Sequence, residues 1–175
     1  LVGSSGQVHS FEPTPRTFEV LRSNAGQNEN IYLNQLAVTS EPGAVTLNDY
    51  GPVFSGYNSI YSARMSGAEL NRVKSTRFQA EAVSIDDYVA RKSLTPHFIK
   101  IDAESAEFDI RRGMEKTLRQ FKPMISIEVG DMDIEGVIPC RDLVMYLVNK
   151  CYHAYEFSGV GIVKHQPKDR YVYDN

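Results

Sequence analysis

Three acidic residues stand where a short apolar segment ends and a helical pattern begins. The stretch is IKIDAESAEFDIRRG, residues 99–113, and its first three acids are Asp102, Glu104 and Glu107. Carboxylates in such a place can bind a cation, hold a cofactor, exchange a proton or stabilise the first turn of a helix. Glu107 lies in the predicted helix four residues before Arg111, which predicts an ion pair on the helix surface. Asp102 and Glu104 precede the helix, so we expect them to face a cleft.

Two further acids stand near the ends of predicted strands. Glu12 lies near the end of the alternating segment 7–13. A carboxylate there can accept hydrogen bonds from both hydroxyls of a ribose, or it can be an ordinary solvated acid in a loop. Glu128 is the last residue but one of the predicted strand 124–129. Because neighbouring parallel strands lie about 4.8 Å apart, Glu128 and Asp102 can come close enough to share a proton or bind a hard divalent cation.

Other kinds of chemistry leave no motif in the sequence. HExxH, CxxC, GxSxG and GxxxxGK[ST] are all absent, so no zinc hydrolase, nucleophile elbow or phosphate loop is predicted. The histidines are scattered, and we interpret them as structural or surface residues and expect no metal site. Cys140 and Cys151 fall in one predicted helix, about 16 Å apart along its axis, which is too far for a disulfide. Buried, reduced thiols are therefore predicted, and these fit a cytoplasmic protein.

The composition predicts one globular domain spanning residues 1–175. A chain of 175 residues with 42% hydrophobic residues is long enough to bury a substantial core. Its formal net charge of −3 argues against a surface built for nucleic acid. No run of about eighteen apolar residues occurs, so no membrane span is expected.

Strands are predicted to alternate with helices along the chain. The predicted strands are 7–13, 31–38, 44–50, 77–85, 97–102, 124–129, 153–157, 161–165 and 170–174. The predicted helices are 15–25, 86–92, 106–121 and 140–150. This alternation, with nearly continuous apolar runs in the core strands, predicts a doubly wound, mostly parallel sheet covered by helices on both faces. In such sheets ligands bind beyond the carboxyl ends of the strands, which is where the acids fall.

Several segments between residues 7 and 130 occur in the order and spacing of a known family. They are VHSFEPTPRTFEVLRSNAGQN, LAVTSEPGAVTL, YNSI, SIDDYV, FIKIDAESAEFDIRRGMEKTL and PMISIEV. These segments resemble the FkbM-type methyltransferases, which use S-adenosylmethionine and act mostly on hydroxyls of sugars and secondary metabolites. The resemblance implies a Rossmann-like class I methyltransferase fold.

The resemblance also implies roles for individual residues. Glu12 would hold the ribose hydroxyls of the cofactor, and Asp102 would face its methionine end and the reacting centre. The implied cofactor-binding residues are Glu12, Pro13, Leu36, Ala37, Val38 and Asp102. Asn58 and Ser59 match a short NSS-like stretch, and together with Tyr57 they are predicted to bind the substrate.

The sequence departs from the family pattern in two places. The family's central first strand and its glycine-rich turn should precede residue 1. We therefore expect this chain to be part of a longer protein, with a domain that is partial at its N-terminus and possibly at its C-terminus. Ser105 stands where the family usually has glycine, so the shape of the loop after Glu104 is the least predictable part of the site.

The predicted reaction is transfer of a methyl group to the oxygen of a small hydroxylated acceptor, with no nucleic-acid or membrane partner. Asp102 is the first choice for the base that accepts the hydroxyl proton and Glu104 the second, with Glu128 positioning or sharing the proton. Residues 51–75, an irregular segment with several glycines, are the candidate for a substrate-covering lid. Two alternatives are a nicotinamide-dependent oxidoreductase and a methyltransferase-like binding module without catalysis.

Overall fold

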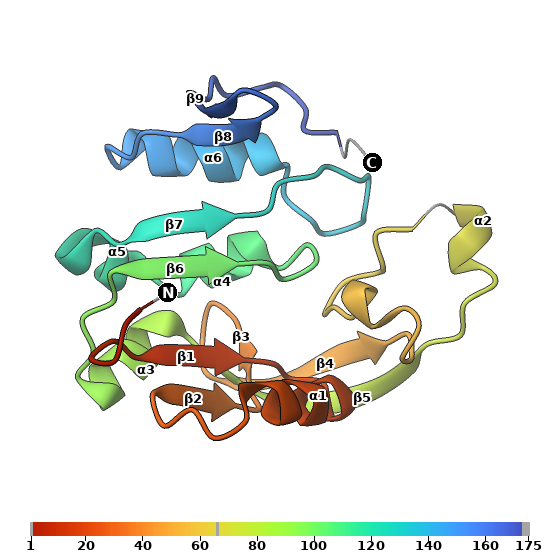
Figure 1. The fold of residues 1–175 in the computed structure, drawn as a ribbon. Coiled ribbons are helices and arrows are strands. Elements are labelled where there is room, and N and C mark those ends of the chain that lie inside the picture. The colour runs from red at the N-terminus through yellow and green to blue at the C-terminus, as the bar shows by residue number, and fades with distance from the viewer. Residues whose placement is uncertain (1, 66, 173–175) are drawn as a thin grey trace.

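The computed structural model describes residues 2–65 and 67–172, in which short strands alternate with helices (Figure 1). The strands are β1 (Val8–Phe11), β2 (Ile31–Asn34), β3 (Ala37–Val38), β4 (Gly43–Asp49), β5 (Thr76–Val83), β6 (Phe98–Ile101), β7 (Met124–Ile127), β8 (Tyr155–Ser158) and β9 (Gly161–Lys164). The helices are α1 (Pro15–Ala25), the 3-10 turn η1 (Ser55–Tyr57), α2 (Gly67–Leu70), α3 (Ile85–Lys92), α4 (Glu107–Arg112), α5 (Glu115–Phe121) and α6 (Cys140–Asn149). The mixed α/β class predicted from the sequence is confirmed.

The strands of the described residues form four small sheets, so the prediction of one doubly wound sheet is wrong. β1 pairs with β2 and β6 pairs with β7, both in parallel, while β5 pairs in parallel with β3 and antiparallel with β4. β8 and β9 form an antiparallel hairpin. The arrows of β1, β2, β6 and β7 point the same way in Figure 1, yet within the described residues no ladder joins β1 to β6. An apolar run predicts that a strand is buried, but it does not specify which strand lies beside it.

The predicted strand 31–38 is divided between two of these sheets. Its first half is β2, and its second half is β3, which pairs with β5 instead of β1. The Asn34 side chain ends β2 by donating to the carbonyl oxygens of Ser10 and Tyr32. At the C-terminus, residues 170–172 are not in a strand, and residues 173 and 174 lie outside the described part of the chain.

The single helix predicted over 106–121 is two helices, α4 and α5, that meet at Gly113. A Cβ atom at position 113 would lie only 2.2 Å from the carbonyl oxygen of Thr39, so the elbow packs directly against the backbone after β3. Asp86 starts the second helix by accepting the backbone N–H groups of Lys116 and Thr117. The sequence periodicity survives this break because both helices turn their apolar sides to the same core.

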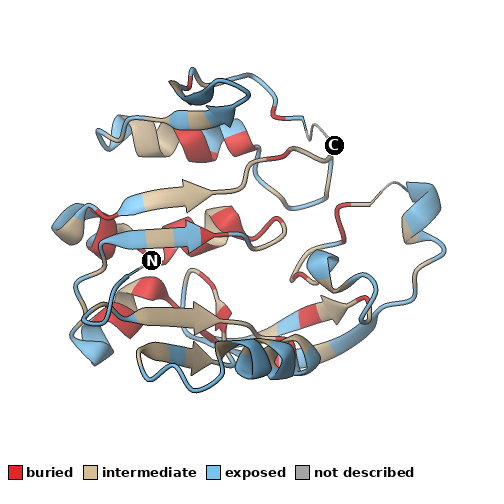
Figure 2. Ribbon diagram, viewed as in Figure 1, coloured by how far each residue is buried: buried red, intermediate tan, exposed pale blue. Residues whose placement is uncertain are grey.

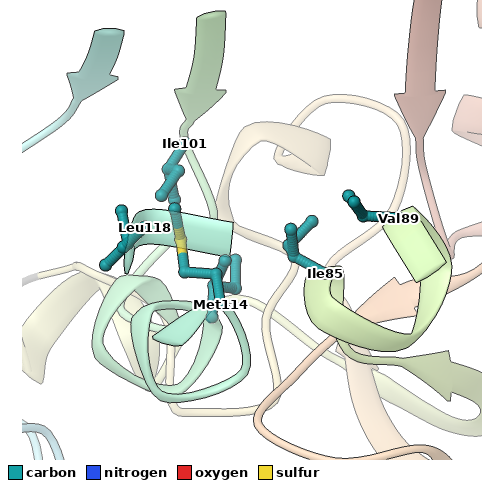
Figure 3. Packing of buried hydrophobic residues seen from close by; sticks show 6 residues of the cluster. Ile85, Val89, Ile101, Met114 and Leu118 are labelled. Carbon is teal, nitrogen blue, oxygen red and sulfur yellow. The ribbon is translucent and has the colours of Figure 1, made fainter. Parts of the chain in front are cut away.

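The main core lies between these helices, α3 and the end of β6. Its buried members are Ile85, Val89, Ile101, Ile110, Met114 and Leu118. Figure 3 shows Met114 reaching from the elbow toward Ile101 and Leu118. Buried residues also gather on the loop that follows β6, whereas α1 buries none of its residues (Figure 2). The core therefore anchors β6 at its last residue, Ile101, directly before the first acid of the predicted site.

The two cysteines are free, but they are not equivalent. Cys140 begins α6 and is buried, as predicted, whereas Cys151 lies beyond the helix, is exposed and has a left-handed backbone with φ of 66°. The prediction that both lie on the apolar side of one helix is therefore wrong for Cys151, because α6 ends at Asn149. The longest described helix has 11 residues, well short of the roughly 20 needed to cross a bilayer.

Candidate functional site

Asp102, Glu104 and Glu128 form a cluster of carboxylates, called here the acid cluster, at the carboxyl ends of β6 and β7. One oxygen of each carboxylate lies within 4.8 Å of the others. The parallel register pairs Ile101 with Ile127, and the Glu128 N–H donates to the Ile101 carbonyl oxygen at 3.1 Å. This register places Glu128 beside Asp102. Carboxylates at this spacing can share a proton or surround a cation, and the residue types alone do not choose between them.

The pKa values of Asp102 and Glu104 are shifted in opposite directions. Lys100 Nζ donates to Asp102 Oδ2 at 2.6 Å, and this hydrogen bond is the main reason that the pKa of Asp102 is lowered. Within the described residues, no hydrogen bond or ion pair reaches the Glu104 carboxylate. Burial, reinforced by the charges of Glu128, Asp102 and Glu107 and opposed by that of Arg64, raises the pKa of Glu104 to about 7. At neutral pH the cluster therefore holds an ionised acid beside one that is about half protonated.

The loop that carries these acids, residues 102–106, is called here the acid loop, and its backbone is left-handed at Glu104 and Ser105. Their φ angles are 48° and 83°, which are unfavourable for residues with a side chain. Glu107, at the start of α4, accepts the backbone N–H groups of Ala103 at 3.1 Å and Ser105 at 3.3 Å. Glu107 therefore fixes the shape of the acid loop.

The expected ion pair between Glu107 and Arg111 is wrong. Glu107 is only 4% exposed and faces back toward the acid loop, because side chains on a helix tilt toward its N-terminus. Arg111 instead pairs with Glu115 at 2.8 Å. Glu115 also pairs with Lys150, at 3.6 Å.

Arg64 is the site residue that the sequence did not reveal. Its side chain is 4% exposed and comes from residues 51–75, called here the excursion. It pairs with Glu107 at 3.1 Å and with Glu128 at 3.4 Å, and its Nε–H donates to Ser105 Oγ at 2.9 Å. A single arginine in an irregular, polar segment has no periodicity that would mark it as buried. The acids at the strand ends were the only available signal, since buried acids need a cation.

Glu12 follows β1 and is half-buried. Its Oε1 atom accepts the backbone N–H of Thr14 at 2.7 Å. The pKa of Glu12 is raised, chiefly by burial, although the hydrogen bonds from Thr14 oppose this shift. Thr14 occupies the position before α1 with Pro15 in the first turn, but the Thr14 side chain does not cap the helix. The Thr14 hydroxyl instead accepts a hydrogen bond from Asn58 at 3.3 Å.

The predicted adenine contacts follow Asn34 closely in the sequence, and the Asn34 carbonyl oxygen accepts the N–H of Glu12 at 3.1 Å. Ala37 is buried in a small core between β3, β4 and β5, while Leu36 and Val38 are half-buried. Pro13 is also half-buried. Glu12 and Pro13 thus follow the carboxyl end of β1 and Leu36 follows that of β2, while Ala37 and Val38 lie in β3, which pairs with β5.

Of the three predicted substrate residues, Asn58 and Ser59 form hydrogen bonds within the chain, whereas Tyr57 is exposed. Asn58 Oδ1 accepts the Tyr50 N–H, while the Ser59 hydroxyl donates to the Glu104 carbonyl oxygen at 2.5 Å. The excursion therefore contacts Thr14, next to Glu12, through Asn58 and the acid loop through Ser59. Tyr57 is 37% exposed, and its ring centroid lies 6.4 Å from that of the exposed Phe54. Tyr57 is therefore the member of this set that a ligand can reach.

Two surface depressions of about 360 Å³ each lie elsewhere on the molecule. One lies between α3 and α5, and the other lies between the first two strands and α3. Neither is lined by Glu12 or by the acid cluster. The candidate site is accordingly identified by its residues and their charges rather than by a deep pocket.

Comparison with known proteins identifies one family. The sequence profile described as the methyltransferase FkbM domain matches residues 1–157. A solved structure similar to this chain is that of methyltransferase FkbM from Methylobacillus flagellatus KT, with 16% sequence identity and a TM-score of 0.45. The match covers 70% of this chain and 26% of that one, so the chain spans about a quarter of the length of that protein. No curated protein matches the sequence.

Proposed function

The chain belongs to the FkbM methyltransferase domain family, and from this premise we propose that it methylates a hydroxyl oxygen of a small acceptor, a sugar or secondary metabolite, with S-adenosylmethionine as the methyl donor. The observation that carries the proposal is the acid cluster, in which the Glu104 carboxylate, with a pKa of about 7, lies within 4.8 Å of those of Asp102 and Glu128. We set aside a nicotinamide-dependent oxidoreductase because the family is one of methyltransferases.

Glu12 fits the role of the residue that holds the ribose of the cofactor. A carboxylate offers several acceptor sites, and the Thr14 N–H occupies one of them. Its position after β1 is the one in which acids of doubly wound folds accept ribose hydroxyls. Leu36, Ala37 and Val38 are proposed to border the adenine, and Asp102 the methionine end. When bound, S-adenosylmethionine supplies a positively charged sulfonium whose methyl group is open to in-line displacement.

Glu104 is a better candidate than Asp102 for the base that takes the proton of the acceptor hydroxyl. A general base works best when its pKa lies near the working pH, and that of Glu104 is about 7. Asp102 is a weaker base because Lys100 lowers its pKa, but it keeps a negative charge that attracts a cationic ligand. Glu128 is proposed to position or share the proton. The open face of Tyr57 is proposed to contact the acceptor.

The function is tested by calorimetric titration of the full-length protein with S-adenosylhomocysteine. We expect Glu12→Ala to weaken binding at least about tenfold, since hydrogen bonds to a charged group contribute roughly 1.5–3 kcal/mol. Glu29→Ala is the matched control. Glu29 is exposed and precedes β2, whereas Glu12 follows the parallel strand β1, so the two acids lie at opposite ends of this strand pair.

Unchanged affinity in Glu12→Ala would remove the proposed role of Glu12, and absence of binding by the wild-type protein would remove the proposed function. Incubation of the wild-type protein with S-adenosylmethionine and a panel of hydroxylated acceptors then separates an enzyme from a binding module. An enzyme produces S-adenosylhomocysteine with at least one acceptor, whereas a binding module binds the cofactor without turnover.

A further inference from the structure

We propose that Arg64 is a positioning residue that fixes the acid loop and sets the net charge of the acid cluster facing the cofactor. This inference rests on the proposed function for its account of the ligand. The proposed locking of the loop rests on contacts within the chain alone.

The Arg64 guanidinium joins three separate pieces of the site. It pairs with Glu107 at the start of α4 and with Glu128 after β7, and it donates to Ser105 in the acid loop. The planar guanidinium group presents its donors in a fixed fork, so one side chain can hold three acceptors in a defined arrangement. A lysine keeps the charge but presents a single ammonium in place of this fork.

Glu107 transmits this arrangement to the loop backbone. One of its oxygens contacts Arg64, and the other accepts the N–H groups of Ala103 and Ser105, which flank Glu104. The Ser59 hydroxyl holds the Glu104 carbonyl oxygen from the same part of the excursion. Ser59 and Arg64, the first and last of residues 59–64, therefore both hold the acid loop. This part of the excursion is a fixed support and not a lid.

Ser105 gives independent support for a direct link between Arg64 and the loop. Its φ of 83° is a left-handed conformation that glycine adopts more easily than serine. Its side chain is buried, and its hydroxyl accepts the Nε–H of Arg64. The hydrogen bond therefore gives the serine hydroxyl a function that a glycine at this position lacks.

The charge of Arg64 offsets that of the acids around it. Besides Arg64, the acid cluster is contacted by one other cation, Lys100, among the described residues. Removing the Arg64 charge makes the site more negative, by less than one unit because its loss also favours the protonated form of Glu104. S-adenosylmethionine and S-adenosylhomocysteine have nearly the same shape, but only the first carries a sulfonium charge. The ratio of their dissociation constants therefore reports the electrostatics of the cluster, and a general loss of structure would lower both affinities without favouring the charged ligand.

The test compares Arg64→Gln, Arg64→Lys and wild type by titration of the full-length protein with both nucleosides. We expect Arg64→Gln to shift the ratio toward S-adenosylmethionine by about three- to tenfold, as for a partly screened charge. Arg64→Lys should lower both affinities and keep the ratio within about twofold of wild type. Arg72→Gln, at an exposed arginine of the same excursion, should change neither affinity.

A wild-type ratio in Arg64→Gln, or an equal shift in Arg64→Lys, would overturn the proposed charge role. If the wild-type protein binds neither nucleoside, the proposed function fails and the charge role falls with it.

The locking of the loop is tested separately by amide hydrogen exchange in the absence of ligand. The N–H groups of Ala103 and Ser105 should exchange at least about tenfold faster in Arg64→Lys, and also in Ser105→Ala, which keeps all the charges. Thermal unfolding monitored by circular dichroism establishes that each variant is folded, and Ser105→Ala serves if Arg64→Gln does not fold. Unchanged exchange at both amides in both variants would show that Arg64 does not position the loop.

Discussion

The strand ends that precede Glu12 and Glu104 are built in different ways. Glu12 is held by the N–H of Thr14, two residues further along the chain. Glu104 is held in a left-handed loop by Ser59 and, through Glu107, by Arg64, which lie forty or more residues away along the chain. The first arrangement is local and survives the loss of distant contacts. The second depends on residues 59–64. Substitutions far along the chain can therefore displace Glu104, whereas they leave the turn that holds Glu12 in place.

The largest expected effect is on stability. Arg64→Met leaves Glu107, whose side chain is 5% exposed, without its buried cation, and breaking such a pair costs about 3–5 kcal/mol. Glu12→Gln keeps the local turn and should cost less than about 1 kcal/mol. Equilibrium urea denaturation measures both. Equal costs for the two variants would contradict the distinction between a local and a long-range arrangement, and adding Glu107→Gln to Arg64→Met should restore part of the lost stability.

The next effect is on turnover. Glu104→Gln removes the proposed proton acceptor and should lower the rate of methyl transfer by about 10²–10⁴-fold, the usual contribution of a general base. The wild-type rate should rise with pH through about 7, because the carboxylate must be deprotonated to act. Glu12→Gln should lower cofactor affinity and leave this pH dependence in place. The measurement is initial rate against pH with an accepted hydroxylated substrate, and an unchanged profile in Glu104→Gln would move the base elsewhere.

The smallest effect is the pH dependence of stability. The folded state raises the pKa of Glu104 from 4.5 to about 7, so the folded state binds this proton more tightly than the unfolded chain does. Its contribution to stability is fully present below about pH 4.5 and is lost as pH rises through about 7. Wild type should therefore lose melting temperature relative to Glu104→Gln between pH 5 and 8. The same slope in both proteins would contradict the raised pKa.

The sequence predicted those parts of the site that depend on strand order and local turns. Asp102 and Glu128 follow apolar runs that pair in parallel, and their closeness follows from that pairing alone. Likewise Pro15 and Gly26 mark the two ends of α1 through backbone preferences that need no tertiary contact.

The features that the sequence did not predict depend on contacts between residues far apart in the chain. Local sequence patterns carry no information about such contacts. Arg64 is buried against acceptors that include Glu107, Glu128 and Ser105, and no residue near it in the sequence indicates this. Gly113 interrupts a continuous helical periodicity because the backbone at Thr39 lies against it. The division into four sheets likewise reflects which strand edges meet, and apolar runs do not encode this.

The left-handed backbone at Glu104 has a consequence for how this protein can evolve or be engineered. Glycine at this position would relieve the unfavourable φ of 48° and remove a poorly solvated carboxylate, so Glu104→Gly is expected to stabilise the fold. Selection for stability alone would therefore tend to replace Glu104. A laboratory selection for thermal tolerance, without selection for methyl transfer, should recover substitutions at position 104 early, and selection for activity should remove them again.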